Sequence, residues 1–326
     1  MIEITNSIRF IKKYPLVIFF VFTFVFSWVL FFIYIVFPNE ISQLLIFIAI
    51  YAPAITALII SRIIGRQQND SRKKLKWVIF TVVWIIATLT FIAYYYMRIL
   101  DLLIVIFVLA VFLGLLPALM ISSGFSNNPS IKMIFESYIK PKGHFVWYLV
   151  AILLVPSSLL LGAILTLLLG QSVSWISLPY GFELIGLIAI TFMYTFFYGA
   201  GTNEEPGWRG FALPRLQSKF SPLIASIILG LIWGFWHTPI YLPQYSSLIQ
   251  YGIFLLNTIK IAIILTWLYN RTGGSVLAAA LLHTIGNITF EFLPSTLASE
   301  LIQLGVMIVL ILTDRMWKKK KELKSD

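Results

Sequence analysis

Apolar runs of about 20 residues, separated by short polar stretches, occupy most of the chain. An α-helix rises about 1.5 Å per residue, so runs of this length can cross the hydrocarbon core of a bilayer. Turn residues such as Pro38-Asn39-Glu40 and Gly170-Gln171-Ser172 separate the runs. The pattern predicts about ten membrane helices, near Pro15–Phe37, Ile41–Ile64, Trp77–Met97, Leu102–Ile121, Phe145–Leu169, Ile185–Leu213, Pro222–Leu242, Tyr251–Asn270, Val276–Leu293 and Leu297–Thr313.

Lysine and arginine gather in every second loop between the predicted helices. Basic residues precede the first helix and follow the second, fourth, sixth, eighth and tenth, whereas the loops between are nearly free of them. The positive-inside rule places basic loops in the cytoplasm, so both termini are expected there, in the cell membrane. The first apolar run is too long for a cleaved signal peptide and is interpreted as an anchor.

Composition narrows the class of protein further. Of the 326 residues, 60% are hydrophobic and 11% are charged, which excludes a soluble domain and predicts an all-α, polytopic membrane protein with about 8–10 transmembrane helices. The net charge of +11 is explained by the cytoplasmic loops, so no nucleic-acid partner is expected, and the lipid bilayer is the first expected partner. The absence of cysteine excludes disulfides and thiolate catalysis.

A few ionisable and polar residues interrupt the apolar runs of the second half. Glu204-Glu205-Pro206-Gly207-Trp208-Arg209 places three charged side chains within six residues. Such groups cost roughly 2.5–3.5 kcal/mol each inside a bilayer and usually mark a functional site. His237, and His283 with Asn287, lie in later apolar runs.

The depth of these residues depends on where the sixth helix ends. A helix that ends at Gly201 would leave the glutamates at the cytoplasmic surface, roughly 24 Å from His237. A helix that continues through Pro206 to about Leu213, with a kink, raises Glu204 by roughly 15 Å. We favour the second arrangement because membrane proteins tolerate such groups around a protein-lined, water-filled cavity. It predicts one cavity near mid-membrane, open to the cytoplasm.

Helical spacing suggests how the side chains divide their tasks. Glu205 and Arg209 are four residues apart and can pair, whereas Glu204 points about 100° away and can face the cavity. His283 and Asn287 are also four apart and share one helix face. A carboxylate, two histidines and an amide suffice for amide hydrolysis, since they provide a base for water and donors for the oxyanion.

The motifs Glu-Glu-x-x-x-Arg, aromatic-x-x-x-His and His-x-x-x-Asn, in this order and in apolar helices, resemble those of the CAAX prenyl protease and bacteriocin-processing (CPBP or Abi) family of intramembrane endopeptidases. The resemblance covers roughly residues 145–313. It implies three regions: accessory transmembrane helices over 1–144, a protease core over 145–313, and a basic cytoplasmic tail over 314–326.

The resemblance also implies a role for each motif residue. The first glutamate acts as the general base that activates water, and the second-motif histidine positions that water. The third motif stabilises the oxyanion, while the second glutamate and the arginine support the site. In this sequence the catalytic residues are Glu204, His237, His283 and Asn287, and the supporting residues are Glu205, Arg209 and Trp233. Trp233 replaces the usual phenylalanine and keeps an aromatic wall.

Several alternatives remain open from the sequence. Glu204, His237 and His283 form a His₂Glu set of the kind that holds catalytic zinc, but no His-Glu-x-x-His helix is present and no obligatory metal is expected. A non-catalytic immunity or regulatory protein and, less favoured, a small-solute transporter are the rival functions. The substrate could be a prenylated CAAX tail, a leader or signalling peptide, or a membrane-protein segment. Lys260 could line the cavity or pair with Glu291.

Overall fold

The computed structural model describes residues 2–65, 72–98 and 103–319, and these residues form helices joined by turns, with no strand among them. The first part of the chain contributes eight of the described helices. They are α1 (Ile2–Lys13), α2 (Pro15–Val36), α3 (Glu40–Ile50), α4 (Ala52–Ile64), α5 (Lys73–Arg98), α6 (Leu103–Leu113), α7 (Leu115–Ser123) and α8 (Pro129–Ile139).

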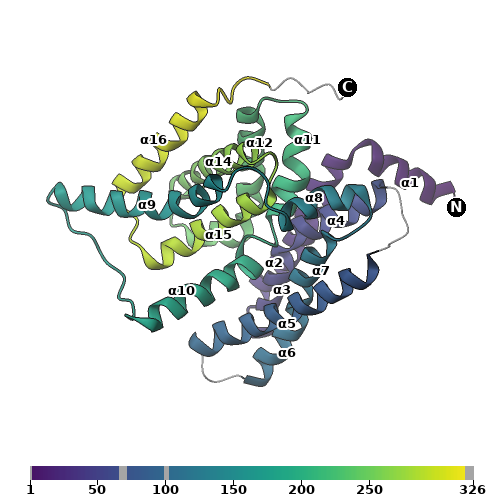
Figure 1. Cartoon of the computed structure of the whole chain (residues 1–326), viewed down its shortest axis with the longest axis horizontal. Helices are drawn as coiled ribbons and strands as arrows, with labels where there is room; N and C mark the ends of the chain where they lie inside the picture. The colour runs from purple at the N-terminus through teal and green to yellow at the C-terminus, as the bar shows by residue number, and fades with distance from the viewer. Residues whose placement is uncertain (1, 66–71, 99–102, 320–326) are drawn as a thin grey trace.

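The second part of the chain contains the elements that hold the motif residues. They are α9 (Val146–Leu168), α10 (Phe182–Tyr194), the π-helices η1 (Thr195–Gly199) and η2 (Pro206–Ala212), α11 (Leu213–Gln217), α12 (Pro222–Trp236), α13 (Thr238–Tyr241), the 3₁₀ turn η3 (Leu242–Gln244), α14 (Leu248–Arg271), α15 (Val276–Phe292) and α16 (Leu297–Thr313). In Figure 1 the N-terminal helices lie to the right and below, and α9 and α14 to α16 lie to the left.

The expected all-α, polytopic membrane class is confirmed. Among the described residues, six helices are long and apolar enough to cross a membrane, or up to eight if each of two bent pairs is one span. The pairs bend by 47° between α3 and α4 and by 51° after α12. Pro53 and Pro239 lie in the first turn of the second helix of each pair, where a missing backbone N–H costs little. Two shorter apolar helices, α15 and α16, complete the ten predicted segments.

The prediction that the sixth helix runs unbroken over Ile185–Leu213 is wrong. The helix ends at Gly199, Ala200 has φ −161° and ψ −58°, and a turn leads to the start of η2 at Pro206. Polar side chains stabilise this break: the Thr202 hydroxyl donates to the carbonyl of Phe196, and the Asn203 amide donates to that of Tyr198. These bonds occupy carbonyls that a continuous helix would pair with backbone N–H groups.

Two short helices, α1 and α8, lie outside the predicted spans. The Asn128 side chain caps α8 by accepting from the backbone N–H groups of Ser130 and Ile131, and Pro129 occupies its first turn. Both are common signals of a helix start. The helix buries Ile134 and Phe135 in the hydrophobic core that also contains η2.

The N-terminal helices pack directly against η2. Phe19 of α2 contacts Trp208 edge to face, with ring centroids 5.6 Å apart. Gly207 lies so close to α4 that an added Cβ would be 2.5 Å from the backbone carbonyl of Pro53. Residues from α2, α4, α8, η2, α12, α14 and α15 belong to one buried core. The two predicted regions, 1–144 and 145–313, therefore share a core, and the first supports the element that holds the glutamates.

Candidate active site

Glu204 lies in the turn before η2 and is 4% exposed. One of its carboxylate oxygens, Oε2, accepts hydrogen bonds from two indole N–H groups, Trp208 Nε1 at 3.1 Å and Trp233 Nε1 at 2.6 Å. Two N–H donors on one oxygen fix the orientation of the carboxylate. Among the described residues no bond to Oε1 is formed, so this oxygen is available to a molecule in the adjacent cavity.

Glu205 has different partners from its neighbour. Its Oε1 accepts from Arg209 Nη1 at 2.9 Å and lies 2.7 Å from His283 Nδ1. Glu205 and Arg209 are fully buried, and the guanidinium carbon of Arg209 lies 4.8 Å from the centre of the Trp233 ring. The pairing of Glu205 with Arg209 follows from their four-residue spacing. The contact of Glu205 with His283 joins the start of η2 to α15 and could not be predicted from spacing.

His237 occupies the bend between α12 and α13. Its Nδ1 lies 2.9 Å from the carbonyl oxygen of Trp233, one helical turn earlier. Because a carbonyl oxygen can only accept, Nδ1 carries a hydrogen, and the neutral ring presents a lone pair on Nε2. The ring packs against Trp236 and Tyr241, with centroids 4.6 and 5.3 Å away. The bend and these rings fix the imidazole in one orientation.

His283 and Asn287 lie one turn apart on α15, as their spacing predicts. The His283 ring is edge to face with Trp233, at a centroid distance of 5.1 Å, and its Nδ1 is held by Glu205. Asn287 is exposed, and its amide has no hydrogen-bond partner among the described residues. The amide N–H₂ group is therefore free to donate.

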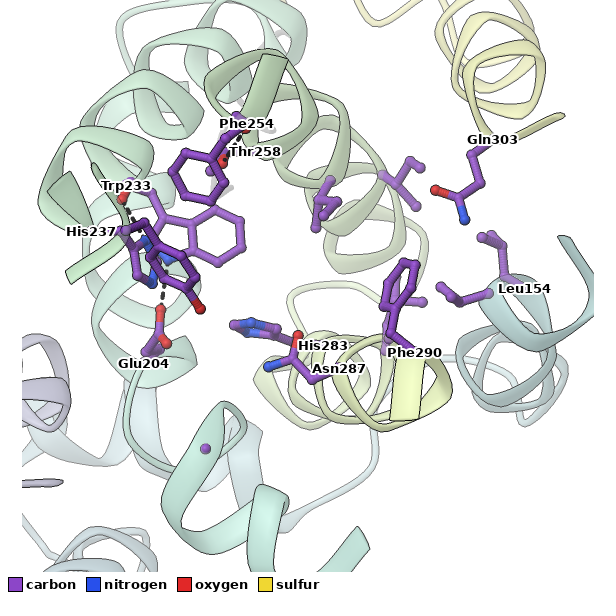
Figure 2. Close-up of a pocket in the computed structure, with 17 residues that line it drawn as sticks. Leu154, Glu204, Trp233, His237, Phe254, Thr258, His283, Asn287, Phe290 and Gln303 are labelled. Carbon is purple, nitrogen blue, oxygen red and sulfur yellow. Dashed lines mark hydrogen bonds between the residues drawn. The ribbon is translucent and has the colours of Figure 1, made fainter. Parts of the chain in front are cut away.

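One cavity of about 180 Å³ brings together Glu204, Trp233, His237, His283 and Asn287. Figure 2 shows Glu204, Trp233 and His237 on one side of it and His283 with Asn287 on the other. Apolar side chains of α9, α14 and α15 form most of the remaining wall: Leu154, Val155, Phe254, Ile261, Ile264, Leu282 and Phe290. A few polar groups at one end of an apolar pocket are typical of a binding or catalytic site.

The residues that the sequence placed in the site differ in how they reach the cavity. Glu205 and Arg209 do not line it and contact it only through their neighbours. Trp208 was missed, although it lies four residues after Glu204 and donates to its carboxylate. Trp233 provides an N–H donor as well as an aromatic wall, a bond that phenylalanine could not make.

Two further expectations concern charged groups and metals. Lys260 Nζ lies 2.5 Å from Glu300 Oε2 on α16, a partner that the sequence did not suggest, and Lys260 does not line the cavity. Within the described residues, no three His, Asp or Glu side chains are arranged to hold a metal ion. Whether Glu204, His237 and His283 use a metal stays open.

Comparisons with known proteins agree with the motifs. Residues 184–289, which include all seven motif residues, match the family model for type II CAAX prenyl endopeptidase Rce1-like proteins. The chain is also similar to CAAX prenyl protease 2 of Methanococcus maripaludis, with 31% identity over 180 residues. The matched part covers 52% of this chain and 65% of that protein, so the chain spans less than two thirds of the relative. The chain is thus a multi-pass membrane protein that is similar, over the segment holding the motifs, to CAAX prenyl endopeptidases of the CPBP family.

Proposed function

We propose that the protein is an intramembrane endopeptidase that hydrolyses a peptide bond of a membrane-associated peptide or protein with water activated by Glu204. One observation carries the proposal: two indole N–H groups hold one oxygen of the Glu204 carboxylate, and its other oxygen is left for a molecule in the cavity that His237 also lines. A base fixed in this way loses little entropy when it binds water.

The reaction would use the acceptor atoms that Glu204 and His237, which both line the cavity, leave unbonded among the described residues. Glu204 Oε1 and His237 Nε2 both accept, so each can receive one hydrogen of a water molecule and turn its lone pair towards the substrate carbonyl. As the water oxygen attacks the carbonyl carbon, Glu204 takes its proton. When the carbon–nitrogen bond breaks, the Glu204 carboxyl group returns that proton to the departing amine.

The oxyanion donors lie on α15. The Asn287 amide donates in its ordinary state. In His283, Nδ1 donates to Glu205, so Nε2 can donate to the oxyanion only from a doubly protonated ring. Arg209 donates to Glu205 and holds its carboxylate in place. Glu205 and Arg209 thus act through His283, and we assign them a positioning role. We expect the reaction to need no obligatory metal.

The name of the Methanococcus maripaludis relative supplies the first substrate to test, a prenylated peptide with a CAAX terminus. Unmodified leader or signalling peptides are the second class. We would compare cleavage of a farnesylated and an unmodified CAAX peptide by the purified protein in lipid nanodiscs, with Glu204→Gln as the inactive variant. In parallel, peptides from membranes of cells producing wild type or Glu204→Gln would be compared by mass spectrometry.

Glu183→Gln is the matched control, because Glu183 is an exposed glutamate in the first turn of α10. The proposal expects a peptide to be cut by wild type and Glu183→Gln and to remain intact with Glu204→Gln. Identical peptide profiles for wild type and a folded Glu204→Gln variant would favour the non-catalytic alternative.

A further inference from the structure

A second polar region lies among the N-terminal helices, outside the segment that matches the family. Two adjoining cavities, of about 310 and 590 Å³, share Arg62 at the end of α4, Lys76 in α5 and Leu119 in α7. Lys73 lines the larger one. We call this region the basic pocket and define it by Arg62, Lys73, Lys76, Ser122 and Ser123.

The cations of the basic pocket lack anionic partners in the part of the chain that the structure describes. The ion pairs found there involve other basic residues, and none involves Arg62, Lys73 or Lys76. Helix α5 also begins with lysines and has no acidic residue in its first turn. Positive charge at a helix N-terminus opposes the helix dipole, so an external anion at this end would stabilise both the lysines and the helix.

Hydrogen-bonding groups form the opposite wall of the pocket, and their backbone is fixed. Arg72 donates from Nε to the side-chain oxygen of Asn127 at 3.1 Å and from Nη2 to the carbonyl of Ser126 at 3.2 Å. These bonds tie the start of α5 to the segment between α7 and α8. Ser122 lines the larger cavity and Ser123 the smaller, and each hydroxyl donates to the carbonyl of Leu119, at 3.3 and 2.7 Å. The three cations of the pocket suit the oxygens of a phosphate.

The outer wall of the basic pocket is apolar and exposed. Ile59 of α4 is 53% exposed, Trp77 of α5 is 59% exposed and Leu119 of α7 is 39% exposed. In a multi-pass membrane protein such surfaces contact acyl chains, and tryptophan is frequent at the level of the head groups. A ligand that uses both walls needs an anionic head and apolar chains. Free phosphate would leave the apolar wall unused.

We propose that the basic pocket binds an anionic phospholipid, with its phosphate between Arg62, Lys73 and Lys76 and its acyl chains along α4, α5 and α7. Basic pockets between membrane helices are suited to such head groups. The lipid would join α4, α5 and α7, and α4 in turn packs against η2 through Pro53 and Gly207. Occupancy should therefore stabilise the helices that support the glutamate turn.

The test uses the full chain, purified and delipidated in a neutral detergent. Binding of phosphatidylglycerol and of phosphatidylcholine would be measured by native mass spectrometry, and the thermal midpoint would be followed with each lipid. We expect wild type to retain phosphatidylglycerol and to gain thermal stability from it, with a smaller response to phosphatidylcholine. Two charges near a membrane surface change affinity for anionic lipid by roughly 10- to 30-fold, so Arg62→Gln/Lys76→Gln should bind phosphatidylglycerol that much more weakly.

Two controls separate charge from folding. Lys142→Gln/Lys219→Gln removes two exposed positive charges that line neither cavity and should bind phosphatidylglycerol like wild type. Arg62→Lys/Lys76→Arg keeps both charges and should also retain the lipid. Equal affinity of wild type and Arg62→Gln/Lys76→Gln for phosphatidylglycerol would overturn the proposal. So would an equal response to phosphatidylcholine, or full stabilisation by inorganic phosphate alone, which would indicate a free-anion site.

Discussion

The charged side chains of the active site are bonded to partners inside the protein, whereas those of the basic pocket lack a carboxylate partner among the described residues. Around η2, Glu205, Arg209 and His283 are buried and bonded to one another. Around α5, Arg62 and Lys73 are exposed, and no carboxylate among the described residues pairs with them. A buried charge must have its partner within the protein because its desolvation is costly, whereas an exposed cationic pocket can take its partner from outside. The first arrangement suits fixed catalytic groups, and the second suits exchangeable ligands.

The comparison predicts its largest effect at Arg209. Arg209→Ala would leave Glu205 and its bond to His283 without the cation that compensates them, at a cost of roughly 3–5 kcal/mol. Thermal unfolding in detergent, followed by scanning fluorimetry, should show a clearly lower midpoint, and cleavage should fall as well. An unchanged midpoint would mean that the buried pair contributes nothing to stability.

A smaller effect is expected at Trp233. Trp233→Phe keeps an aromatic ring but removes the N–H donor at 2.6 Å from Glu204. Hydrogen bonds to charged groups contribute roughly 1.5–3 kcal/mol to stability, so the thermal midpoint should fall, by less than in Arg209→Ala. If the same free energy is lost from the transition state, the rate of cleavage should fall by about 10- to 100-fold. Trp208→Phe, which removes the longer bond, is the paired measurement. Wild-type rates for both variants would show that the indole donors do not orient the base.

The contact between the two regions can be tested at Gly207. Gly207→Ala would place a Cβ 2.5 Å from the backbone carbonyl of Pro53 and should separate η2 from α4, at a cost of roughly 1–3 kcal/mol. Gly186→Ala in α10 is the matched control, because nothing lies within 4 Å of its added Cβ. The control should unfold at or above the wild-type midpoint. Equal midpoints for the two variants would contradict close packing of α4 on η2.

The smallest effect on stability is expected when the cations of the basic pocket are removed in the absence of anionic lipid. In lipid-free neutral detergent, Arg62→Gln/Lys76→Gln should change the free energy of unfolding by no more than about 0.5 kcal/mol, as is usual for solvent-facing residues. Comparing the thermal midpoint of Arg62→Gln/Lys76→Gln with that of Arg209→Ala therefore measures how much more a buried cation contributes to stability than exposed ones. A loss as large as that of Arg209→Ala would mean that the pocket cations have structural partners.

The sequence predicted the ten apolar segments because hydrophobic run length reports directly on helices that face lipid. It did not predict the break between Gly199 and Pro206, since the bonds of Thr202 and Asn203 that stabilise this break form only in the folded chain. The helix α8 had readable signals in Asn128 and Pro129 but is too short and polar to be found as a membrane span. Its contacts with η2 depend on how the helices pack and could not be predicted from local sequence.

In the site, too, contacts within one helix were predicted and contacts between helices were not. Spacing predicted the pairing of Glu205 with Arg209 and the common face of His283 and Asn287, because both depend on a single helical turn. The contacts of Trp233 with Glu204 and of His283 with Glu205 join residues on different helices and depend on how these helices pack. The depth of the cavity in the bilayer stays a prediction, as do the catalytic roles.

The central claim is that Glu204 activates the attacking water, and single-turnover cleavage by purified protein in nanodiscs tests it most directly. Glu204→Gln keeps the size of the side chain and its acceptor for the indole N–H groups but cannot take a proton. The rate should fall by at least about 10²-fold relative to wild type, while Glu183→Gln cleaves at the wild-type rate and all three proteins share one thermal midpoint. Near-wild-type cleavage by folded Glu204→Gln would contradict the account.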